Sequence, residues 1–164
     1  MHAIETLFQH NLWANLKVIN ACRDLDDAVL DASVPGTYGS IRATLTHIVR
    51  AEGNYLRRLS GQQPDRSGWG EVPTLDQIRA GAQHTGEALI RESSRVQPSD
   101  MLQVEWEGET GKFPASIVLL QAINHATEHR THINTILTQQ GITPPDVDGW
   151  SYMWAIKAEE QKDA

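Results

Sequence analysis

A long amphipathic pattern occupies residues 115–140, with the sequence ASIVLLQAINHATEHRTHINTILTQQ. Its stripe recurs at steps of four and three residues and consists of Val118, Ala122, His125, His129, Ile133 and Ile136. Because that spacing follows one face of an α-helix, the stretch predicts a helix that ends before Gly141. Its two central histidines therefore lie on the face that should meet a hydrophobic core.

Working outward, similar helical periodicity is found over residues 3–24, 41–60, 75–96 and, more briefly, 149–160. Ser40 is a good N-cap for the second helix, and Gly61 suits the left-handed residue that follows its last turn. Thr74 and Gln77 have the spacing of a capping box at the start of the third helix. These patterns predict one all-α domain over residues 1–164, a four-helix bundle with a short extra C-terminal helix.

The segment before the fourth long helix has a different pattern. Apolar and polar residues alternate from Leu102 onward, as in a half-buried strand. A turn over Gly108–Gly111 would fold residues 101–113 into a small hairpin, and Pro114 suits the first turn of the next helix. Residues 62–73 contain Pro64 and two glycines and are expected to form a loop.

Composition narrows the class of protein. The formal net charge of −7 disfavours nucleic acid and anionic membranes as partners. No apolar run reaches the roughly 18 residues of a membrane span, and residues 1–5 lack a signal-peptide pattern. Cys22 is the only cysteine, so no internal disulfide can form. We therefore expect a cytoplasmic protein.

The two core-facing histidines suggest a metal site. His125 and His129 lie about 40° apart around the helix and about 6 Å along it, so both imidazoles can reach one ion. An ordinary hydrogen-bonded histidine pair is the alternative, because this spacing also occurs by chance. A third ligand is needed, and the candidates are His2, His10, His47, His84 and His132. Periodicity does not choose His47, which lies about 130° from its helix's apolar stripe.

Four short motifs in order resemble the DinB/YfiT-like metalloenzyme superfamily over nearly the whole chain. They are the WAN-like residues 11–15, residues 39–48 with Glu52, the NHxxxHR-like residues 124–130, and residues 141–146 with Tyr152. The resemblance selects His47 and implies that His47, His125 and His129 hold one divalent transition metal such as zinc, nickel or iron. It also implies a homodimer. The family usually has glutamine where this chain has His132, which is expected to support a ligand or simply to pack.

Three imidazoles leave a coordination position for water or substrate, as in catalytic metal sites. Resemblance to the family implies a thiol S-transferase that joins a low-molecular-weight thiol to a small-molecule electrophile. A cleft lined by aromatic residues such as Trp13, Tyr55 or Trp150 would then receive the electrophile, although core packing is the favoured role for each ring. Arg130 is expected either to meet an anionic substrate or to form a surface ion pair.

Two other functions stay open. Metal-dependent hydrolysis is one, because residues 125–129 match the HxxEH pattern of one zinc protease class, in which Glu128 would take part. A non-catalytic metal-binding stress protein is the other. A di-iron carboxylate centre is disfavoured because no helix has a glutamate three residues before a histidine.

Overall fold

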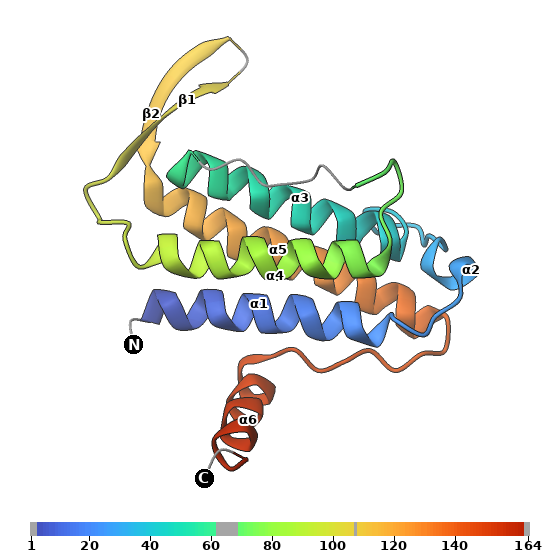
Figure 1. Ribbon diagram of the computed structural model, residues 1–164. Helices are drawn as coiled ribbons and strands as arrows, with labels where there is room; N and C mark the ends of the chain where they lie inside the picture. The colour runs from blue at the N-terminus through green and yellow to red at the C-terminus, as the bar shows by residue number, and fades with distance from the viewer. Residues whose placement is uncertain (1–2, 62–68, 107, 163–164) are drawn as a thin grey trace.

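The computed structural model describes residues 3–61, 69–106 and 108–162. Four long helices, α1 (Ala3–Ala21), α3 (Ile41–Ser60), α4 (Leu75–Ser93) and α5 (Ala115–Gln139), form a bundle (Figure 1). Helices α1 and α3 each pack against both α4 and α5. The predicted helical bundle is confirmed, and so is the short C-terminal helix α6 (Gly149–Glu160), which projects from the α1 side (Figure 1).

The helix ends follow the expected capping signals. Ser40 accepts a hydrogen bond from the Ala43 amide, and Gly61 has a φ of 73° after the last turn of α3. Thr74 and Gln77 form both hydrogen bonds of the capping box on α4. The first and third helices each end three residues earlier than predicted, because the chain tightens into turns after Ala21 and Ser93. The sequence did not predict the four-residue helix α2 (Asp27–Leu30), which is too short to show a helical period.

The hairpin forms, but its turn was predicted two residues too late. Strands β1 (Met101–Trp106) and β2 (Glu109–Pro114) pair antiparallel, with Trp106 opposite Glu109. Gly108 has a φ of 84°, the conformation that a two-residue hairpin connection favours. Thr110 and Gly111, expected in the turn, therefore lie in β2. Pro114 is the N-cap of α5 and not part of its first turn. Most of the loop predicted over residues 62–73 lies outside the described residues.

The bundle interior has two hydrophobic clusters. One is centred on side chains such as Val18, Leu45, Ile78 and Ile133, and the other on Phe8, Leu56 and Leu89. Helix α3 is buried over a wide face because α4 and α5 flank it, which explains why His47 lies off the apolar stripe yet against α5. Among the described residues, no helix is long and apolar enough to cross a membrane.

Candidate metal centre

Three histidines from two helices meet between α3 and α5. The candidate ligand nitrogens of His47, His125 and His129 all lie within 4.8 Å of one another. His47 comes from α3, and His125 and His129 are one helical turn apart on α5. The Nε2 atoms of His47 and His125 are 2.9 Å apart. His129 is buried and the other two are partly buried, so the cluster lies at the edge of the bundle interior.

The donor set fits a divalent transition metal. Around a tetrahedral ion with metal–nitrogen bonds of about 2.1 Å, the nitrogens are about 3.4 Å apart. This value lies between the 2.9 Å of the His47–His125 pair and the 4.8 Å limit for all three residues. A ligand histidine commonly binds through one ring nitrogen and hydrogen-bonds through the other. His47 Nδ1 is 2.9 Å from the Tyr38 hydroxyl, and His129 Nδ1 is 3.3 Å from His132 Nδ1. Both arrangements leave Nε2 available, so these residues could form a metal site.

The surroundings keep the three imidazoles neutral, as metal ligation requires. Burial, together with nearby His129 and His47, lowers the pKa of His125 to about 4. Burial also lowers the pKa values of His47 and His129, and His47 and His132 add to the effect at His129. The Nδ1 atom of His125 is buried without a hydrogen-bond partner among the described residues. Protonation of this cluster is therefore unfavourable near neutral pH.

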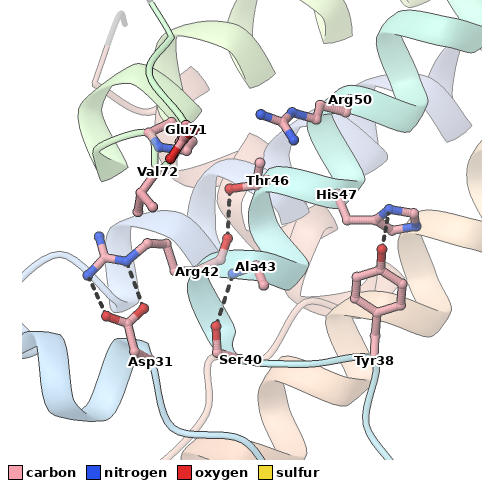
Figure 2. A pocket seen from close by; sticks show the side chains of 11 residues that line it. Asp31, Tyr38, Ser40, Arg42, Ala43, Thr46, His47, Arg50, Glu71 and Val72 are labelled. Atoms are coloured by element: carbon pink, nitrogen blue, oxygen red, sulfur yellow. Dashed lines mark hydrogen bonds and ion pairs between the residues drawn. The ribbon is translucent and has the colours of Figure 1, made fainter.

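Tyr38 is a residue at this centre that the sequence did not reveal. Its ring stacks on His47, with centroids 4.1 Å apart and planes at 25°. Figure 2 shows the hydroxyl pointing at the His47 imidazole. The sequence feature that could have indicated Tyr38 is its position. It lies in a glycine-flanked connector, two residues before the α3 N-cap. Solvent-exposed connectors often carry functional side chains.

A pocket of about 410 Å³ opens beside His47 and Tyr38. Thr46, Arg50 and Val72 line it together with these two residues (Figure 2). Arg42 also lines the pocket. Its guanidinium is held by ion pairs with Asp27 and, at 2.9 Å, with Asp31. Of the three histidines, His47 is the one that lines this pocket.

The remaining candidate histidines have different positions. His10 Nε2 lies 2.8 Å from the Val147 carbonyl oxygen, close to Trp13 and Tyr152. His84 is exposed on α4, and His2 lies outside the described residues. His132 contacts His129, as expected for a residue that supports a ligand.

Only one of the three expected cleft aromatics is near the centre. The Tyr55 ring is edge-on to His125, with centroids 5.9 Å apart. Trp13 instead packs against Tyr152 of α6, with centroids 5.2 Å apart. Trp150 also lies on α6 and is 73% exposed. Periodicity places a ring on a helix face, but it does not say which neighbour that face meets.

A buried polar network connects three helices next to the histidines. Oε1 of Glu52 on α3 accepts hydrogen bonds from the side-chain amides of Asn11 and Asn15 on α1, at 2.7 and 2.8 Å. The carbonyl oxygens of the same amides accept from Nη1 of Arg130 on α5, both at 2.7 Å. Arg130 Nη2 also donates to Thr127.

Both charged groups of this network are inside the bundle. Glu52 is fully buried and Arg130 is 4% exposed, so Arg130 forms neither a surface ion pair nor an exposed anion site. Burial raises the pKa of Glu52, and it lowers the pKa of Arg130 to about 10. The network binds the segment of α5 that carries His129 to both α1 and α3.

The structure is a helical bundle with a candidate three-histidine centre, and comparisons with known proteins identify its family. The DinB family model matches residues 1–163. Protein DinB of Bacillus subtilis (strain 168) is 20% identical over 165 residues, covering 94% of this chain and 95% of that protein. The crystal structure of a DinB-like protein from Bacillus cereus ATCC 10987 has a TM-score of 0.65 at 18% identity and covers 88% of this chain and 95% of that one. The chain belongs to the DinB family.

Proposed function

We propose that His47, His125 and His129 hold one divalent transition metal and that the protein is a metal-dependent thiol S-transferase. The supporting observation is the convergence of three neutral imidazoles within 4.8 Å, beside a pocket open to small molecules. Three protein ligands leave a position for a further ligand. A divalent ion held there would lower the pKa of a thiol in that position and so favour the thiolate.

In this proposal the protein positions the metal ligands and keeps the three imidazoles unprotonated. The depressed pKa values of the three histidines leave their nitrogen lone pairs free near neutral pH. The pocket beside His47 receives the electrophile. The thiol sulfur forms a bond to the electrophilic carbon, the leaving group departs with its electron pair, and the thiol proton goes to solvent.

Metal-dependent hydrolysis and a non-catalytic metal-binding stress protein are the competing functions. The same three ligands would suit activation of water, but Glu128, the acidic residue of the HxxEH match, is exposed on α5. A purely structural ion would be enclosed by protein ligands, whereas His47 and His125 are only partly buried. These observations favour an accessible centre.

Metal content tests the first half of the proposal. Protein purified without an affinity tag should contain about one metal ion per chain by elemental analysis. His47→Ala, His125→Ala and His129→Ala should each lose it, whereas His84→Ala, an exposed histidine on α4, should retain it. Equal metal content in all variants would refute the three-histidine centre.

Thiol consumption tests the second half. The metal-loaded protein is mixed with 1-chloro-2,4-dinitrobenzene and, in turn, glutathione, cysteine or coenzyme A. Loss of thiol above the His125→Ala background is expected for at least one of them. Hydrolysis of 4-nitrophenyl acetate without thiol loss would identify a hydrolase instead. If the metal-containing protein shows neither activity, the transferase proposal is refuted and only metal binding remains.

We also propose that the protein is a homodimer. Apolar side chains remain exposed on α5, where Ile117 is 49% and Leu120 is 56% accessible, and on α6, where Trp150 and Trp154 exceed 60%. The two residues of each pair are three or four positions apart and so share one face of their helix, and contiguous exposed apolar patches mark association surfaces. Light scattering after size-exclusion chromatography should give twice the chain mass of 18.3 kDa. A monomer at micromolar concentration would refute this.

A further inference from the structure

We propose that Tyr38 is a positioning residue of the histidine centre, which fixes the tautomer and the ring orientation of His47. The inference rests on the proposed metal-binding role of His47, but it does not depend on the thiol reaction. Nothing in the sequence motifs assigns a role to Tyr38. The contacts of Tyr38, its exposure and its place in the chain support this role.

Tyr38 touches two of the three histidines, one from each helix. Its hydroxyl lies 2.9 Å from His47 Nδ1, and its ring stacks on the same imidazole. Its ring is also edge-on to His129, with centroids 4.8 Å apart and planes at 78°. The phenol thus fixes the outward nitrogen of His47 while His47 Nε2 faces His125.

Core packing does not explain why Tyr38 adopts this position. The side chain is 51% exposed, and its described ring contacts are to imidazoles. The backbone is held on both sides of Tyr38. Thr37 donates hydrogen bonds from its amide and its hydroxyl to the Val34 carbonyl oxygen, and Ser40 caps α3. The connector therefore presents the ring to the cluster without burying it in the core.

The hydrogen bond has a defined consequence for metal binding. When Nδ1–H of His47 donates to the Tyr38 hydroxyl, the lone pair is on Nε2, which is the nitrogen that faces His125. Such partners of ligand histidines orient the ring and raise its basicity, and their loss typically weakens metal binding about 10- to 100-fold. His132 offers a comparable partner to His129 from α5.

The test measures zinc affinity directly. Zinc dissociation constants are determined by competition with a fluorescent chelator at pH 7.5 for the wild type, Tyr38→Phe and Tyr38→Leu. Tyr152→Phe is the matched control, because it removes a phenol hydroxyl from a ring that packs against Trp13 and His10. We expect Tyr38→Phe to bind zinc about 10-fold more weakly, Tyr38→Leu more weakly still, and Tyr152→Phe as tightly as the wild type.

Two further readouts separate positioning from a general effect on the fold. Long-range ¹H–¹⁵N spectra of the zinc protein should show the Nδ1–H tautomer of His47 in the wild type and a changed His47 signal in Tyr38→Phe. Metal-free Tyr38→Phe should unfold at the same urea concentration as the wild type, as is usual for substitutions at exposed sites.

The proposal is overturned if Tyr38→Phe binds zinc within about twofold of the wild type, or if Tyr152→Phe is equally weakened. A wild type that binds no zinc would overturn it together with the metal centre. A wild type that binds zinc but transfers no thiol would refute only the transferase.

Discussion

Glu52 and Arg130 are joined through the same two side chains, since Asn11 and Asn15 each donate to Glu52 and accept from Arg130. The opposite charges thus share a pair of amide bridges in the bundle interior. Buried charges are costly unless they are paired and hydrogen-bonded, and Glu52 Oε2 is buried without a hydrogen-bond partner among the described residues. This arrangement connects α1, α3 and α5 at the level of the histidine centre, and it gives sharp expectations for mutation.

Removing one charge of this network should be costly. Arg130→Met leaves two amide oxygens and the Glu52 carboxylate without their buried cation, and we expect a loss of about 3–5 kcal/mol in the free energy of unfolding. Urea denaturation of the metal-free protein measures it. In Arg130→Met/Glu52→Gln, which removes both charges, part of this loss should be recovered. Additive effects of the two substitutions would show that the charges are not coupled.

The metal-free protein should lose stability as the pH falls below about 6.5. Because the pKa of His125 is about 4 when folded and 6.5 ordinarily, the unfolded chain takes up a proton between these values and the folded one does not. The associated stability is fully present above pH 6.5 and is lost toward pH 4. A full shift corresponds to about 3 kcal/mol, and partial exposure reduces it to about 1–2 kcal/mol.

His125→Gln provides the control for this pH effect. Urea denaturation at several pH values should show a shallower decline for the variant than for the wild type between pH 6.5 and 4.5. Protonation of carboxylates affects both proteins alike. Parallel curves would contradict the assigned role of His125.

Helices α1 and α4 should not tolerate a methyl group at Gly86. A Cβ built there would lie 2.6 Å from Leu12 Cδ1 and 3.1 Å from Leu12 Cβ and Cγ, so Gly86→Ala must shift the contact between the helices. We expect thermal or urea denaturation to show a loss of about 1–3 kcal/mol despite the better helix propensity of alanine. Glu87→Ala, the exposed neighbour, should change stability by about 0.5 kcal/mol or less. A stabilising Gly86→Ala would refute the close approach.

His132 should act through its hydrogen bond to His129. Glutamine retains an acceptor for His129 Nδ1–H, so His132→Gln should bind zinc within about threefold of the wild type. His132→Leu removes the partner and should weaken binding about 10-fold. Chelator competition measures both, with His84→Leu, at an exposed position on α4, as the control. Loss of zinc binding in both His132 variants would instead indicate direct ligation.

Local signals in the chain predicted most of the fold. The stripe of residues 115–140 and the caps at Ser40, Gly61 and Thr74 located the helices, because helical period and capping depend on residues only a few positions apart. The turn residues of the hairpin were misplaced because Gly108 and Gly111 both suit a turn and pairing decides between them. Spacing on one helix likewise brought His125 and His129 together.

What the sequence by itself determined was therefore the helices, their ends and one pair of histidines on a common face. The tertiary structure decided which surfaces meet: it turned His47 toward α5, brought Tyr38 onto its imidazole, and buried Arg130 between Asn11 and Asn15. The physical reason is that helical periodicity fixes directions around one axis, whereas contacts between helices depend on how several axes pack. Resemblance to a family selected His47 in advance, but no periodicity within its own helix could do so.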